Sequence, residues 1–197
     1  SEAYSKSYLG ETLLEGSITK PAFDVDALTV NGYLGIDGIK PMIEDCNKYG
    51  KGIFVLVKTS NPSSTQLQDM VVEDGRKVFE VVADLVADWG KDVIGECGYS
   101  SVGAVVGATW PQQLKSLRER MPQTCFLVPG YGAQGGGAED VAGAFDKEGL
   151  GAIINASRSL MCAHKLKKWE GKFTEEEFDI ACREEAIDMR NKLQNVW

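Results

Sequence analysis

Short apolar runs rich in β-branched residues alternate with helical patterns along this chain, and this alternation limits the possible folds more than any other feature. The runs lack the polar alternation of a half-exposed sheet, so we predict parallel strands that are buried on both faces. Strands separated by helices require right-handed crossovers, which place the strands in one parallel sheet. The predicted strands are residues 27–30, 53–57, 102–106, 126–128 and 152–154.

Helical patterns fill the intervals between these strands. A chain of 197 residues, 43% of them hydrophobic, is long enough for one sizeable core, so we predict a single domain over residues 1–197 with a C-terminal helical extension at 167–197. Thr174 and Glu177 have the spacing of a capping box for the last helix. The predicted helices are 36–49, 67–89, 112–120, 139–147, 158–166 and about 174–193, and the predicted loops are 16–26, 59–65 and 131–138.

The number of strands leaves two architectures open. Residues 1–4 already have a helical pattern and no methionine precedes them, so we expect residue 1 to lie in the helix after a third strand. The chain would then supply about strands 4–8, with their helices, of a (β/α)8 TIM barrel whose first three units lie upstream. The alternative is an open, doubly wound sheet of five strands, which the length also permits.

Two strand ends run into turns of small residues that precede helical patterns, at residues 125–137 and 151–159. Backbone N–H groups at a helix start, the helix dipole and a forked guanidinium all favour a phosphate dianion. Successive strand ends of a barrel are neighbours, so we expect both turns to hold one phosphate. For either turn alone, tight glycine turns and a surface arginine would be the better explanation, and only the two turns together favour a phosphate site. The predicted ligands are the side chains of Gln134 and Arg158 and the N–H groups of Gly135, Gly136, Ser157 and Arg158.

Polar residues follow the earlier strands at the same predicted rim. Ser60 comes directly after one strand and is placed to hydrogen-bond the edge of a planar ligand, although a plain turn at Asn61 fits the spacing as well. Lys58 is a candidate catalytic group, but its alternation with Val57 favours an outward position or an ion pair. Val106 and Thr109 are expected near the mouth of the barrel.

Charge and composition exclude several classes of function. A net charge of −8 argues against nucleic acid as a partner, and no apolar run is long enough to predict a membrane partner. Five widely spaced cysteines without a C-x-x-C pair predict reduced thiols and a cytoplasmic protein. The single histidine, His164, lies in a basic helix and is expected to cover a helix end instead of acting as a base, so we expect neither a Ser-His-Asp triad nor a His-rich metal site.

Several motifs together resemble the orotidine 5′-phosphate decarboxylase family, especially its longer bacterial-type branch. The likeness extends from residue 1 to about residue 164, with the motifs in consistent order. They are T-V-N-G-Y-L-G at 29–35, F-V-L-V-K-T-S-N-P-S at 54–63, V-V-G-A-T at 105–109, V-P-G-Y-G-A-Q-G-G at 128–136 and I-N-A-S-R-S at 154–159.

The resemblance implies decarboxylation of orotidine monophosphate (OMP) to uridine monophosphate (UMP) in pyrimidine biosynthesis, with no metal and no cofactor, by a homodimer. It assigns the phosphate to Gln134 and Arg158 and the pyrimidine edge to Ser60. Val106 and Pro129 resemble the apolar wall beside the departing carboxylate.

One departure from the family pattern limits this assignment. The family's catalytic lysines and aspartates lie on the first three strands and end in a D-x-K-x-x-D-I segment, which is expected immediately before Ser1. We therefore expect no catalytic residue in this chain and no activity from residues 1–197 alone. Two alternatives stay open: another phosphosugar barrel enzyme, such as an epimerase or a sugar-phosphate decarboxylase, and a non-catalytic phosphate-binding module.

Overall fold

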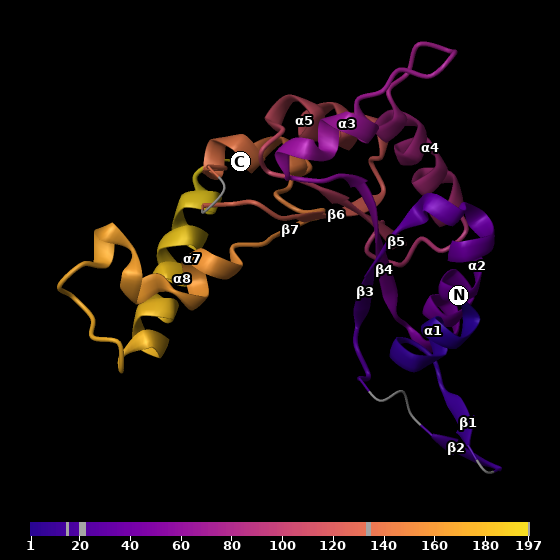
Figure 1. The fold of residues 1–197 in the computed structure, drawn as a ribbon, viewed down its shortest axis with the longest axis horizontal. Coiled ribbons are helices and arrows are strands. Elements are labelled where there is room, and N and C mark those ends of the chain that lie inside the picture. The colour runs from indigo at the N-terminus through magenta and orange to yellow at the C-terminus, as the bar shows by residue number, and fades with distance from the viewer. Residues whose placement is uncertain (15, 20–22, 133–134, 197) are drawn as a thin grey trace.

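A parallel sheet of five strands forms the centre of the molecule (Figure 1). The structure, a computed structural model, describes residues 1–14, 16–19, 23–132 and 135–196. The strands are hydrogen-bonded in chain order, which excludes the doubly wound alternative because that topology reverses its strand order. All five predicted strands are confirmed, and they are β3 (Ala27–Val30), β4 (Gly52–Lys58), β5 (Ser100–Val106), β6 (Thr124–Val128) and β7 (Ala152–Ile154).

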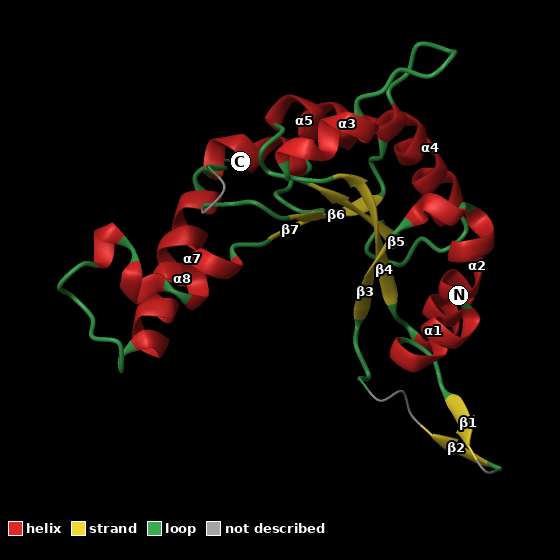
Figure 2. Cartoon of the chain, in the orientation of Figure 1, coloured by secondary structure: helices red, strands yellow, loops and turns green. Residues whose placement is uncertain are grey.

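Helices cover the outer, convex side of this curved sheet (Figure 2). Helices α2 (Ile36–Tyr49) and α4 (Val78–Gly90) pack on β4 and β5. The predicted helix 36–49 is confirmed, and it ends at Gly50, whose left-handed backbone with φ 66° suits glycine. The other helices are α1 (Glu2–Tyr8), α3 (Thr65–Gln68), α5 (Pro111–Arg120), α6 (Ala138–Val141), α7 (Ser157–Met161) and α8 (Phe178–Gln194). None of the described helices is long and apolar enough to cross a membrane.

The predicted helix 67–89 is wrong over its first half. Helices α3 and α4 are separated by a hairpin-like loop, in which Val71 and Lys77 form an antiparallel bridge. The turn lies at Asp74-Gly75, where Gly75 has φ 88°. An Asp-Gly dipeptide favours such a turn, but apolar residues at helical spacing on both sides concealed the signal. Figure 1 shows this loop projecting between α3 and α4.

Other boundaries also differ from prediction. The predicted helices 139–147 and 158–166 break early into 3₁₀ turns at Ala142–Ala144 and Ala163–Lys165. Strands β1 (Thr12–Leu14) and β2 (Ser17–Thr19) form a small antiparallel sheet where part of a loop was predicted. In the last helix, the Glu177 carboxylate accepts from the N–H and from the hydroxyl of Thr174, and the first of these bonds is one half of the predicted capping box. The Glu177 N–H donates to the Thr174 carbonyl instead of its hydroxyl, and regular helix begins only at Phe178.

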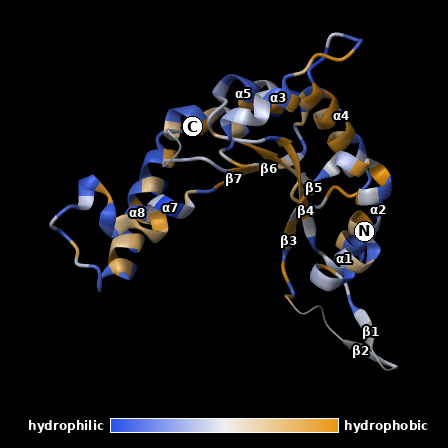
Figure 3. Ribbon diagram, in the orientation of Figure 1, coloured by the Kyte–Doolittle hydropathy of each residue, from blue (hydrophilic) through white to orange (hydrophobic). Residues whose placement is uncertain are grey.

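The two faces of the main sheet differ in how far they are covered. Outer-face side chains such as Val55, Ala104 and Phe126 are fully buried against the helices. On the inner face, the register aligns one apolar row across four strands, and its edge residue Ile153 is 52% exposed. That row consists of Leu56, Val105, Leu127 and Ile153. Figure 3 shows the apolar character of the sheet, and in a (β/α) barrel such inner side chains fill the interior.

Candidate functional site

The loops at the carboxyl ends of β4, β5 and β6 form a connected rim. The Thr109 hydroxyl donates to the Ser60 carbonyl at 2.9 Å, and the Ala108 N–H donates to the Pro129 carbonyl at 2.8 Å. A Cβ added to Gly107 would lie 2.7 Å from the backbone N and Cα of Ser60, so only glycine permits this approach. Three predicted site residues, Ser60, Thr109 and Pro129, are thereby linked along this rim.

The glycine-rich turn after β6 lies against both of its neighbours. Within the turn, the Gly132 N–H donates to Gly136 at 2.7 Å and the Gly135 N–H donates to Gly132 at 2.9 Å. A Cβ on Gly132 would lie 3.1 Å from the Ser159 hydroxyl, and one on Gly136 would lie 2.8 Å from the Cβ of Ala108. The turn is therefore packed between the β5 loop and the start of α7.

Ser157 and Arg158 are the first residues of α7, and both are exposed. Arg158 and Gly132 both border one pocket of about 510 Å³, and its other lining residues come from α7, the segment that follows it and Glu185 of α8. Gln134 lies outside the described residues, and its contact with a phosphate stays a prediction. Helices α6 and α7 have only 4 and 5 residues, so their dipoles contribute less than the sequence suggested, and backbone N–H groups and Arg158 must carry the charge.

The two predicted wall residues have different surroundings. Val106 ends β5 and is fully buried in the core, while Pro129 follows β6 and is half-buried at the rim. Their place beside a reacting carboxylate stays a prediction.

Lys58 forms the ion pair that was one of its two predicted environments, and its side chain also points outward from the sheet, towards the covering helices. Its side chain is fully buried, and its Nζ lies 2.7 Å from the carboxylate of Asp69. The strand alternation fails here because β4 has a register irregularity between Leu56 and Lys58. Sequence reasoning missed Asp69 and Trp110 as neighbours, since nothing in the local pattern marks contacts that the loop and α5 bring together.

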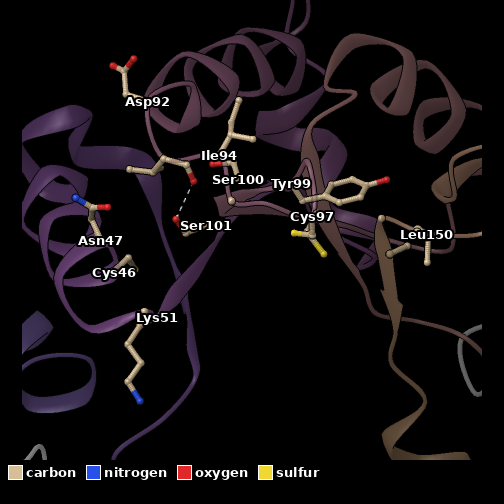
Figure 4. A pocket seen from close by; sticks show the side chains of 16 residues that line it. Cys46, Asn47, Lys51, Asp92, Ile94, Cys97, Tyr99, Ser100, Ser101 and Leu150 are labelled. Atoms are coloured by element: carbon tan, nitrogen blue, oxygen red, sulfur yellow. Dashed lines mark hydrogen bonds between the residues drawn. The ribbon is translucent and has the colours of Figure 1, made fainter.

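A second cavity, of about 680 Å³, lies at the opposite, amino-terminal ends of the strands (Figure 4). Two of its polar side chains are engaged within the protein: Ser101 donates to the Val93 carbonyl at 3.1 Å, and Tyr99 donates to Asp146 at 2.5 Å. Ligands of parallel barrels bind at the carboxyl ends of the strands. We therefore assign the functional site to the rim and not to this cavity.

Comparison with known proteins supports the same family. A profile described as the orotidine 5′-phosphate decarboxylase / HUMPS family matches residues 15–168. The orotidine 5′-phosphate decarboxylase of Caldicellulosiruptor bescii is 54% identical over 164 residues, which are 83% of this chain and 53% of the relative. That of Rhodopirellula baltica is 45% identical over 192 residues, covering 98% of this chain and 62% of the relative.

A solved structure gives the same result for the fold. The OMP decarboxylase of Leishmania donovani aligns with a TM-score of 0.61 and 29% identity, over 94% of this chain and 62% of that chain. The chain spans about half the length of the C. bescii relative that it matches. The family profile covers all five strands of the main sheet and the loops of the rim. The chain belongs to the orotidine 5′-phosphate decarboxylase / HUMPS family.

Proposed function

We propose that the protein carrying these residues decarboxylates OMP to UMP without a cofactor, and that this chain holds the phosphate and the pyrimidine ring. The observation that carries the proposal is the connected rim, which runs from Ser60 through Thr109 and Pro129 to the turn at Gly132 and the start of α7. A nucleotide has its base and its phosphate at opposite ends, so a site for it needs two such groups of contacts on one edge of the sheet.

The proposed roles follow from the chemistry of each group. Ser60 bonds the pyrimidine edge, and Arg158 and Gln134, with the N–H groups of Gly136, Ser157 and Arg158, hold the phosphate dianion. The predicted Gly135 N–H is left out of this set because it already donates to Gly132 within the turn. Pro129 and Val106 form the apolar wall beside the carboxylate. Phosphate binding is remote from the reacting carbon, so its energy can hold the substrate carboxylate in an unfavourable position and lower the barrier.

The charged groups that repel the carboxylate and protonate the carbanion are proposed to lie outside this chain. Proton transfer and electrostatic stabilisation need positioned charges at the reacting carbon, and we propose that the complete protein supplies them from strands other than the five described above. Residues 1–197 alone should then bind nucleotide without turning it over.

Turnover of OMP tests the function directly. The protein expressed from the complete reading frame is expected to convert OMP to UMP in a chelator-treated buffer, as followed by the loss of orotate absorbance. A polypeptide of residues 1–197 at the same concentration should give no UMP above background. Absence of UMP formation by the complete protein would refute the proposal, and turnover by residues 1–197 would refute the placement of the catalytic charges.

The competing phosphosugar function is separated by ligand preference. The named relatives at 40–54% identity are orotidine 5′-phosphate decarboxylases, which supports a nucleotide ligand. Calorimetric titration with UMP and with ribulose 5-phosphate is expected to show tighter binding of UMP. Tighter binding of the pentose phosphate would favour the epimerase or sugar-phosphate decarboxylase alternative, and nucleotide binding without any product would favour a non-catalytic module.

We also propose that the complete protein is a cytoplasmic homodimer, as the resemblance implies. Sedimentation equilibrium of the complete protein should give twice the monomer mass. A monomer at concentrations well above those of the activity assay would contradict the dimer without affecting the proposed reaction.

Ser60→Ala should reduce discrimination between bases and leave phosphate binding intact. Loss of one hydrogen bond costs about 1 kcal/mol, so the ratio of UMP to CMP affinity should fall about fivefold while the affinity for inorganic phosphate is unchanged. Ser63→Ala is the control, because Ser63 lies in the same loop and is exposed. An unchanged ratio in Ser60→Ala would remove Ser60 from the base site.

A further inference from the structure

Lys58 has an unusual position for a lysine at the end of a strand. Its register partner is Val106, while Leu56 pairs with Val105. From one pair to the next, β4 therefore advances by two residues and β5 by only one. This β-bulge places Val57 and Lys58 in consecutive buried positions, although strand residues normally alternate. Bulges beside functional sites commonly redirect a side chain, and here the bulge turns the ammonium group towards the helices.

The buried ammonium group has one carboxylate partner and two aromatic neighbours. Its Nζ lies 2.7 Å from Asp69, 4.5 Å from the ring centre of Trp110 and 5.5 Å from that of Phe79. The pKa of the Asp69 carboxyl is lowered from its ordinary value, first by the hydrogen bond from Lys58. A buried ion pair gives little net stability because both charges lose water, so its geometric effect on the surrounding loop is the more informative property.

The ion pair closes the loop that carries Ser60. Asp69 follows α3, and the preceding Gln68 accepts the Thr59 N–H at 2.9 Å and donates to the Thr59 hydroxyl at 2.8 Å. The Lys58 ammonium group lies over the ring of Trp110 in a cation–π contact. The indole N–H of Trp110 donates to the Thr59 carbonyl at 2.8 Å. Thr59 is therefore held on both backbone groups, one residue before Ser60.

Ser60 itself is held only through its backbone among the described residues. Its carbonyl accepts from Thr109, and its Cα lies against Gly107, whereas no described residue hydrogen-bonds its hydroxyl. The Ser60 backbone is thus fixed on one side by Thr109 and Gly107, and on the other through Thr59, which Gln68 and Trp110 hold beside the Lys58–Asp69 pair.

We propose that Lys58 is a positioning residue whose buried ion pair with Asp69 places the Ser60 hydroxyl against the pyrimidine ring. The inference rests on the proposed nucleotide site and adds a determinant of base specificity to it. Lys58 acts on the base end alone, because the phosphate turns at Gly132 and Arg158 are held by contacts on other strands.

Lys58→Met tests this role, because methionine keeps the length and apolar contacts of the stem and removes the charge. In the complete protein, the UMP to CMP affinity ratio should fall about fivefold, as for loss of the Ser60 bond, with inorganic phosphate affinity unchanged. Lys77→Met is the matched control: Lys77 contacts the same carboxylate at 3.2 Å but is 42% exposed, and its loss should leave the ratio unchanged. An unaltered ratio in Lys58→Met, or an equal fall in both variants, would overturn the positioning role.

A double variant separates positioning from a general loss of stability. If Lys58 acts through Ser60, Lys58→Met should not lower the ratio further in a Ser60→Ala background, since coupled residues are non-additive. Additive losses would overturn the inference. Asp69→Asn breaks the same pair more mildly and must reproduce the selectivity loss, so the proposal stays testable if Lys58→Met does not fold. Failure of the unmodified protein to bind UMP would refute the proposed function itself, whereas UMP binding with unchanged selectivity in the variants would refute only the role of Lys58.

Discussion

Arg158→Ala is expected to weaken UMP binding by about 3 kcal/mol, or on the order of a hundredfold in Kd. Arg158 is exposed at the start of α7 and opens onto the pocket that Gly132 also lines. In a protein with a net charge of −8, a dianion must be held by local groups, and a guanidinium is the strongest of those predicted. Isothermal titration of the complete protein with UMP measures the change.

Two further variants are needed to interpret the effect of Arg158→Ala: a second phosphate-ligand variant and a control. Gln134→Ala should weaken UMP binding in the same direction but by less, because the amide donor carries no charge of its own and cannot form the bidentate ion pair that a guanidinium makes with the phosphate. Arg183→Ala is the matched control, since Arg183 is an exposed arginine of α8 outside the pocket. An Arg158→Ala protein that binds UMP as tightly as the unmodified protein would end the phosphate assignment.

Arg118→Met is expected to lower the free energy of unfolding by about 3 to 5 kcal/mol. Arg118 is 8% exposed in α5, and its guanidinium lies 3.8 Å from the ring centre of Phe126. It donates at 2.8–3.1 Å to carbonyl groups on four segments that meet around β6. Those carbonyls belong to Met121, Thr124, Ala144 and Gly151.

The expected loss is large because methionine can fill part of the volume but cannot donate a hydrogen bond to any of these carbonyls. Urea unfolding of the complete protein measures it, with Arg120→Met as the control in the same helix. Arg120 is at the surface, where its pairing with Asp84 contributes about 1 kcal/mol or less. A loss for Arg118→Met no greater than that for Arg120→Met would contradict a structural role for the buried guanidinium.

The strands and their order could be predicted because buried parallel strands have a local signature. Uninterrupted β-branched runs locate β3 to β7, and the alternation with helices predicts that successive strands are neighbours. Helix lengths were less predictable. Apolar spacing continues through the Asp74-Gly75 turn, which lies between α3 and α4, and past Val141, where α6 ends. Periodicity alone does not detect such interruptions.

The rim was predicted in outline, since Ser60, Thr109 and Pro129 each follow a strand whose carboxyl end points to the same edge. The contacts that hold the Ser60 loop in place could not be predicted. The Lys58 side chain contradicts simple alternation because of a bulge, and its partner Asp69 comes from a loop that the sequence assigned to a helix.

The amino-acid sequence by itself determined the order of the elements, the parallel sheet and the family, because these depend on patterns within short segments and on motifs in fixed order. Only the tertiary structure decided that Lys58 is buried against Asp69, that Arg118 joins four segments, and that the Gly132 turn packs on Ser159. These contacts join residues from different elements, and their geometry depends on how the sheet curves and the helices pack, which no local pattern specifies.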